Sequence, residues 1–269
     1  MDAPERSPNK SHSAGRSTAV SRLNGNSRPS RALARVLSKL GAASRTTAAQ
    51  WIQAGRVAVN GTVITDPQFI APEHADVTLD GRILAAADKL YYMLNKPRGL
   101  ITTTHDEHDR ATVYACLPPE LRGQLAPVGR LDKASEGLLL FSNDTAWSAA
   151  ILEPARHLPK RYHVHISRLP DASLFHTLQH GVTCDGEHLQ IYEVTELRRG
   201  EKNAWLEITL IAGKNRHIRR MLAACDVEVL RLIRVAIGPL QLGPLPKSQY
   251  RALEKLELQH LALALARSS

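Results

Sequence analysis

Residues 138–141, Leu-Leu-Leu-Phe, form a continuous apolar run in the middle of the 269-residue chain. A run without alternation is typical of a strand that is covered on both faces, so this segment predicts the centre of a sheet. Four residues separate this run from the preceding segment Gly-Arg-Leu-Asp-Lys, residues 129–133, in which Asp132 lies between two cations. We expect the buried strand to hold this carboxylate in a fixed place, after a turn that Gly129 permits.

Alternating patterns elsewhere predict further strands of the same sheet. Their apolar positions are Tyr162, Val164 and Ile166 in one segment, and Leu206, Ile208 and Leu210 in another. Alternation is typical of strands with one covered face, and Arg199-Gly200 marks a turn before the second segment. For residues 88–269 we expect one α+β domain, with a mixed, mainly antiparallel sheet and flanking helices.

The sequence pattern of residues 31–87 predicts a smaller module of two short helices followed by a hairpin. The apolar stripe of the first helix consists of Leu33, Val36, Leu37 and Leu40. This helix is expected to end at Gly41, and Ser44 is placed to cap the second helix. An Asn60-Gly61 pair between two short apolar segments indicates the hairpin turn.

Before this module, residues 1–30 are rich in Ser, Asn, Arg and Pro and poor in large apolar residues. Such a segment cannot bury enough apolar surface to offset its ordering entropy, so we expect a disordered basic arm. The whole chain carries a formal net charge of +9, which favours a polyanionic partner such as nucleic acid. The exposed cations of the module that could contact this partner are Arg35, Lys39, Arg45 and Arg56.

The cysteines and histidines do not indicate a metal site or a disulfide framework. The chain has three cysteines without a Cys-x-x-Cys spacing, which fits a reducing compartment. His105 and His108 lack the further ligands that zinc requires, and so do His163 and His165. The sequence contains no apolar run near the ~20 residues that cross a bilayer and no signal-peptide pattern at its start. We therefore expect a cytoplasmic protein without a bound metal.

Residues 35–61, RVLSKLGAASRTTAAQWIQAGRVAVNG, resemble the small RNA-binding module first known from a small-subunit ribosomal protein. The shared pattern is a helix, Ser-Arg, a second helix and then Gly-Arg-Val-x-Val-Asn-Gly. Thr46 stands where relatives have another basic residue, so the expected basic patch is smaller by one charge. The resemblance implies that residues 31–87 bind RNA.

Four further segments, KPRGLITT, GRLDKASEGLLLFSND, PKRYHVHI and GKNRHIRRMLAA, resemble the bacterial ribosomal-RNA pseudouridine synthases of the RsuA-like type. The resemblance covers roughly residues 31–256. It implies that uridine in RNA is isomerised to pseudouridine without a metal or an organic cofactor. The partner would be ribosomal RNA, with the 23S RNA of the large subunit favoured and the 16S RNA of the small subunit next, bound by a monomer.

The resemblance also implies roles for individual residues. It makes Asp132 the nucleophile or base at the sugar, Tyr162 the ring that packs on the target base, and Arg219 the partner of the acid. In the same way, Arg130 would fill the space left by an extruded nucleotide. Leu232 would form part of the apolar wall against uracil.

A helical wheel over residues 214–225 agrees with this choice of arginine. At about 100° per residue, Arg219 lies at the border of the apolar stripe, whereas Arg216 and Arg220 lie on the opposite side. We expect these two arginines, together with Lys160, to contact RNA phosphates.

Two other functions remain open. A hydrolase could use Asp132 and Glu136 as paired carboxylates, which glycoside chemistry places ~5–9.5 Å apart. A catalytically silent RNA-binding factor of ribosome assembly would fit the charge and the N-terminal module equally well. The presence of the acid, the tyrosine and the arginine favours the enzyme, and tRNA is the less favoured alternative substrate.

Overall fold

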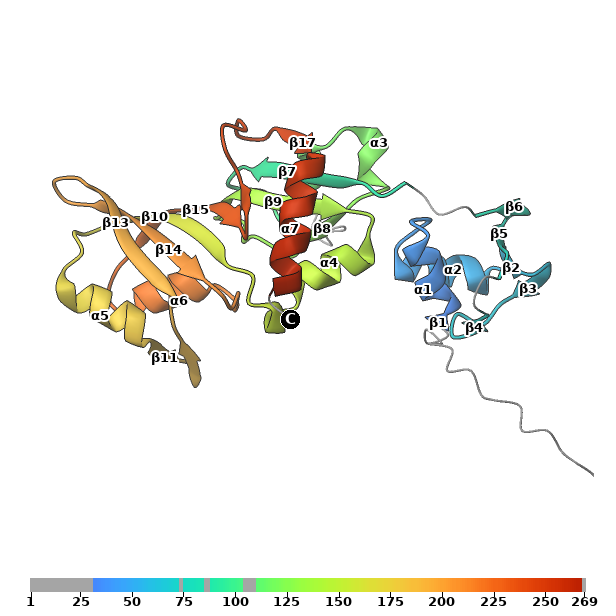
Figure 1. Cartoon of the computed structure of the whole chain (residues 1–269), viewed down its shortest axis with the longest axis horizontal. Coiled ribbons are helices and arrows are strands. Elements are labelled where there is room, and N and C mark those ends of the chain that lie inside the picture. Colours follow the sequence, from blue (N-terminus) through green and yellow to red (C-terminus); the bar gives the residue numbers. More distant parts are fainter. Residues whose placement is uncertain (1–30, 73–74, 85–87, 104–109, 268–269) are drawn as a thin grey trace, which may run out of the picture.

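The computed structural model describes residues 31–72, 75–84, 88–103 and 110–267 (Figure 1). The basic arm expected over residues 1–30 lies outside this range, and so do His105 and His108. None of the described helices is long and apolar enough to cross a membrane.

The N-terminal module has the expected helices and hairpin. Its helices are α1 (Leu33–Lys39) and α2 (Arg45–Gln53), and its strands are β1 (Arg31–Ala32), β2 (Val57–Val59), β3 (Thr62–Ile64), β4 (Ile70–Ala71), β5 (Val77–Leu79) and β6 (Arg82–Ile83). Ser44 caps α2, because its Oγ accepts the backbone N–H of Thr47 at 3.1 Å. Asn60 and Gly61 both have positive φ angles, as the two-residue hairpin turn requires. Leu37 of α1 and Ile52 of α2 are fully buried in a core of the module's own.

The second part of the chain is built on a nine-stranded sheet. Its strands are β7 (Tyr91–Lys96), β8 (Ala126–Val128), β9 (Glu136–Ser142), β10 (Lys160–Ile166), β13 (Glu193–Arg199), β14 (Ala204–Leu210), β15 (Val229–Ile237), β16 (Leu240–Gln241) and β17 (Tyr250–Ala252). The strand order is β13-β14-β10-β15-β9-β7-β17, with β16 beside β15 and β8 beside β9. All pairs are antiparallel except β15 and β9. The predicted α+β fold with a mixed, mainly antiparallel sheet is thus confirmed.

Helices flank the sheet on both sides. They are α3 (Pro119–Arg122), α4 (Thr145–Leu152), α5 (Ala172–His180), α6 (His217–Ala223) and α7 (Lys255–Arg267), with the 3-10 turns η1 (Val113–Cys116) and η2 (Pro154–Arg156) and a separate hairpin of β11 (Val182–Cys184) and β12 (Glu187–Leu189). Residues of α4 and α7 belong to one apolar core and residues of α5 and α6 to another. Strand β9 lies between the two, since Leu138 and Leu140 enter the first core and Leu139 and Phe141 the second. This explains why the apolar run does not alternate.

Gly137 allows β9 and β15 to lie side by side in parallel. It is opposite Arg234 in the register and has a φ of +100°. A Cβ atom at this position would collide with the backbone carbonyl of Arg234. Both the backbone conformation and the space therefore require glycine.

We expect Gly137→Ala to destabilise the fold by about 3 kcal/mol or more, because the collision is with backbone and cannot be relieved by a rotamer change. Gly123→Ala is the matched control, since Gly123 has a φ of −84° at the end of α3 and open space around it. Urea unfolding of both variants measures the difference. Equal midpoints would show that the β9–β15 pairing tolerates a side chain.

Candidate active site

Asp132 lies on the loop between β8 and β9, and its side chain is half-buried. Gly129 opens this loop with a φ of +76°, and a Cβ there would come within 2.9 Å of Leu152. The backbone N–H of Ser135 donates to the carbonyl of Asp132 at 2.9 Å and closes a turn. From the other side, the hydroxyl of Thr102 donates to the carbonyl of Leu131 at 2.8 Å. The loop is therefore fixed on both sides of the carboxylate.

A buried lysine also fixes the Asp132 loop. Lys96, the last residue of β7, is fully buried, and its Nζ donates to the carbonyls of Asp132 at 3.2 Å and Ser135 at 2.8 Å. A third bond goes to the carbonyl of Pro97 at 3.1 Å. Burial lowers the pKa of Lys96 to about 8, while the carboxylates of Glu136 and Asp132 act in the opposite direction. We did not single out Lys96 from the sequence, because two of its three partners lie 36 and 39 residues away along the chain.

Arg219, on α6, reaches the other end of this loop. Its guanidinium donates to the carbonyl of Ala134 at 3.1 Å and to that of Val229 at 3.2 Å. Burial lowers the pKa of Arg219 and Arg216 lowers it further, whereas the charge of Asp132 raises it. Within the described residues Arg219 and Asp132 form no ion pair, but the buried Nε of Arg219 has no hydrogen-bond partner there either. The buried Nε–H donor of Arg219 is thus unused in the part of the chain that the structure describes.

Helix α6 begins later than the sequence indicated. It spans His217–Ala223 rather than 214–225, and Arg216 precedes it in a left-handed conformation with a φ of +47°. Arg216 is exposed, and Arg130 on the Asp132 loop is exposed as well. Lys160 is half-buried, and burial lowers its pKa.

Arg220 has partners that the helical wheel did not predict. It bonds the carboxylate of Glu187 at 2.6 Å and the carbonyl of Cys184 at 2.7 Å, and it lies 3.4 Å from the carboxylate of Asp185. These residues belong to the β11–β12 hairpin and the turn at its tip. Arg220 therefore ties α6 to this hairpin, and its guanidinium is not presented to RNA in the way that we expected.

Tyr162 and Leu232 lie on adjacent strands and on the same face of the sheet. Val164, two residues after Tyr162, is opposite Leu232 in the register of β10 and β15. Tyr162 is 8% exposed and Leu232 is 6% exposed. Both belong to one apolar cluster with Leu131, the neighbour of Asp132, and Ile218, the neighbour of Arg219. Tyr162 and Leu232 thus lie in the cluster that the chain neighbours of Asp132 and Arg219 also enter.

In the N-terminal module, the four expected cations differ in their surroundings. Arg35, Lys39 and Arg45 are exposed on the two helices. Arg56 instead pairs through two bonds with the carboxylate of Asp80 and lies over the ring of Trp51. The positive charge of Arg56 is therefore balanced by Asp80 within the module.

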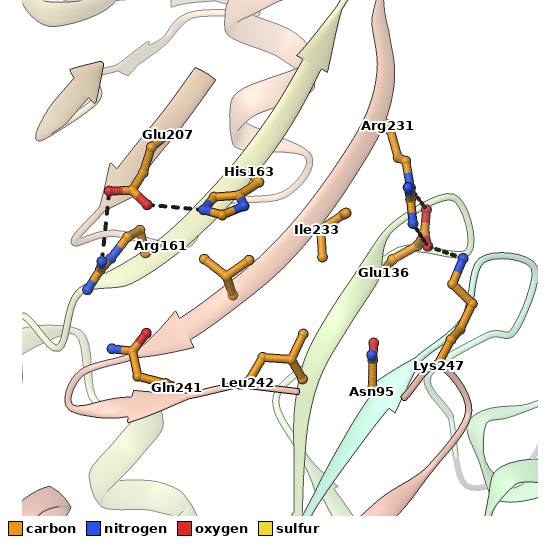
Figure 2. Close-up of a pocket in the computed structure, with 12 residues that line it drawn as sticks. Asn95, Glu136, Arg161, His163, Glu207, Arg231, Ile233, Gln241, Leu242 and Lys247 are labelled. Atoms are coloured by element: carbon orange, nitrogen blue, oxygen red, sulfur yellow. Dashed lines mark hydrogen bonds and ion pairs between the residues drawn. The ribbon is translucent and has the colours of Figure 1, made fainter. Parts of the chain in front are cut away.

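Glu136, the second carboxylate of the hydrolase alternative, is held in a different environment. It is 3% exposed, receives two bonds from Arg231 at 2.7 and 2.9 Å, and lies 2.8 Å from Nζ of Lys247 (Figure 2). These partners lower the pKa of Glu136 to about 2. A carboxylate so occupied has no free oxygen for a sugar and no proton to give, so it does not serve as a general acid. Among the described residues no cluster of His, Cys, Asp and Glu could hold a metal ion.

We expect Glu136 to make the free energy of unfolding depend on pH in the acidic range. Its pKa in the folded chain, about 2, is below the usual 4.5, so its contribution is present above pH 4.5 and is lost as the pH falls towards 2. Between pH 5 and 3 the wild-type chain should lose about 2 kcal/mol more stability than Glu136→Gln. Urea unfolding at both pH values measures this, and parallel losses in the two chains would refute the assignment.

Comparisons with known proteins agree with this arrangement. Residues 90–224 match the family described as RNA pseudouridylate synthase, and residues 33–83 match the S4 domain. A Mycobacterium tuberculosis protein named an uncharacterized RNA pseudouridine synthase is 34% identical over 233 residues, which are 85% of this chain and 92% of the relative. Ribosomal large subunit pseudouridine synthase B of Pseudomonas aeruginosa is 31% identical over 237 residues, which are 86% of this chain and 61% of that protein.

A solved structure gives the same answer for the fold. The crystal structure of a pseudouridylate synthase, 26% identical, has a TM-score of 0.60 and covers 85% of this chain and 98% of that one. Together with the site geometry, the two family matches and the relative that is 34% identical over most of both chains show the family. This chain belongs to the RNA pseudouridine synthases of the RsuA-like type and carries an N-terminal S4 RNA-binding domain.

Proposed function

We propose that this RNA pseudouridine synthase modifies ribosomal RNA and that Asp132 is its catalytic carboxylate. The observation that carries the proposal is the fixation of the Asp132 loop. Its carbonyls are held by the buried Lys96 and by Arg219, whose remaining buried donor is unused. Rigid placement of one carboxylate beside a cation is what a nucleophile or base at the sugar needs.

In the proposed reaction the target uridine is flipped into the site, because its reacting atoms are not accessible within folded RNA. The carboxylate of Asp132 acts on the ribose, the bond from the sugar to N1 of uracil breaks, and the base turns. A new bond joins the sugar to C5, C5 loses its proton and N1 gains one. No atom is added or removed, so no further reactant is required.

The surrounding residues would hold the base and the charge. The ring of Tyr162 and the side chain of Leu232 supply an apolar contact for uracil, since both border the cluster beside the Asp132 loop. Arg219 compensates the charge of Asp132. Arg130 and Arg216, both exposed near the loop and α6, would contact the flanking RNA.

The choice of ribosomal RNA rests on architecture and on one relative. The S4 domain gives a second contact point beside the catalytic domain, which suits a folded RNA that is recognised by shape and unpaired bases. The Pseudomonas aeruginosa relative is named for the ribosomal large subunit. Large-subunit RNA is therefore the first candidate and small-subunit RNA the second.

A pseudouridine map of a strain that lacks this gene tests the substrate. We expect one pseudouridine, or a very few, to disappear from ribosomal RNA and to return when the wild-type gene is restored, but not when an Asp132→Asn gene is supplied. Loss confined to tRNA would contradict the ribosomal substrate. Restoration by the Asp132→Asn gene would contradict the role of Asp132.

A further inference from the structure

The sheet face opposite Tyr162 carries an exposed row of aromatic and cationic side chains. Across four neighbouring strands the register aligns Arg198 of β13 with Trp205 of β14, Trp205 with His165 of β10, and His165 with Arg231 of β15. The rings of Trp205 and His165 are stacked, with centroids 4.8 Å apart and parallel planes. The guanidinium of Arg198 lies 5.5 Å from the Trp205 ring. All four side chains remain exposed or half-exposed.

A furrow runs along this face. One pocket of about 340 Å³ is bordered by Trp205, Arg198, Leu197, His163 and Ile233. A second, of about 460 Å³, shares His163 and Ile233 with the first and continues to Lys247 (Figure 2). Because the two pockets share these two lining residues, they lie side by side on the sheet, and we call them together the furrow.

Cations outnumber carboxylates along the furrow. Arg161, Arg198, Arg231 and Lys247 line it with two carboxylates, those of Glu136 and Glu207. Four positive against two negative charges leave an excess of two positive charges. The cationic groups are also accessible, since the side chains of Arg231 and Lys247 are 40% and 52% exposed.

The furrow ends close to the active site. Glu136 lies at one end of the furrow, with Arg231 and Lys247. It is four residues after Asp132, so the Cα atoms of Asp132 and Glu136 are at most about 14 Å apart. Val229, whose carbonyl bonds Arg219, is two residues before Arg231 on β15. From a uridine placed beside Asp132, a few nucleotides of RNA are therefore long enough to reach the furrow.

We propose that this furrow binds single-stranded nucleotides that flank the target uridine. Unpaired bases stack on aromatic and guanidinium planes, whereas a duplex does not expose its base faces. Trp205, His165 and Arg198 offer such planes, and Arg161, Arg231 and Lys247 lie where phosphates would follow. The inference rests on the proposed function, because the flanking nucleotides belong to the substrate RNA.

The test compares binding of a short labelled oligouridylate to full-length variants by fluorescence anisotropy. Trp205→Ala should weaken binding by about 5- to 100-fold, as loss of one stacking platform does, and Trp205→Tyr should restore most of it. Lys247→Gln should lower the salt dependence by about one phosphate contact. Trp147→Phe is the matched control. Trp147 belongs to α4 and packs edge-on against Tyr91 of β7, away from the furrow. A Trp205→Ala chain that unfolds at the wild-type urea concentration and binds like wild type would overturn the proposal.

Kinetics with two RNA substrates separate this inference from the proposed function. With single-stranded flanks present, Trp205→Ala should raise KM and leave kcat unchanged. With the flanks trimmed, it should match wild type. If wild type forms pseudouridine and the variant has the wild-type KM on both RNAs, the furrow inference fails and the proposed function stands. If an oligoglutamate peptide binds with the same dependence on Trp205, the furrow is a peptide site and the RNA inference fails.

Discussion

Asp132→Asn should abolish pseudouridine formation while RNA affinity remains near that of the wild-type chain. The amide keeps the size and shape of the side chain but is neither a nucleophile nor a base at neutral pH. Loss of a nucleophile or general base commonly costs about 10⁴-fold or more in kcat. Binding should persist, because the bonds that fix the loop run through the backbone carbonyls of Asp132 and Ser135 rather than through the carboxylate.

The measurement is single-turnover conversion of a transcribed ribosomal RNA fragment, with affinity measured in parallel. Asp226→Asn is the matched control, since it makes the same chemical change at an exposed turn with a φ of +53°, which asparagine tolerates. This control should keep wild-type rates. Measurable turnover in purified Asp132→Asn, free of host enzyme, would remove Asp132 from the mechanism.

The strands around the site were predictable from the sequence because each has a burial pattern of its own. Leu138 to Phe141 lack alternation and lie between two cores, whereas Tyr162 and Val164 alternate with polar residues that face the open side. The same alternation placed Tyr162 on a covered face, whereas Leu232 was indicated only by the family resemblance. Local periodicity is a property of the sequence of one strand, so it can be recognised without knowing which other strands and helices that strand contacts.

Features that depend on long-range partners could not be predicted in this way. Lys96 bonds carbonyls that are 36 and 39 residues away, and a lone lysine in a strand carries no sign of them. Arg220 lies on the polar side of α6, as the wheel indicated, but the wheel does not contain the β11–β12 hairpin that neutralises it. The row from Arg198 to Arg231 likewise exists only through the register of four strands.

Arg219→Ala should lower kcat by about 10²- to 10³-fold, the usual cost of removing one preorganised charged or hydrogen-bonding group from an active site. The side chain has two functions in the structure. It bridges the carbonyls of Ala134 and Val229, which positions the Asp132 loop against β15, and its charge acts on Asp132. Its removal leaves the acid without this cation and the loop without one of its supports.

Comparison with Arg219→Lys separates these two functions. Lysine restores the positive charge but cannot donate to both carbonyls in the planar geometry of a guanidinium. If charge compensation dominates, Arg219→Lys should recover most of the rate that alanine loses. If loop positioning dominates, both variants should be slow, and urea unfolding should show a similar loss of stability in each. A near-normal kcat in Arg219→Ala would mean that another cation compensates Asp132, and Arg98 and Arg216, whose charges act on the same guanidinium, would then be the residues to replace.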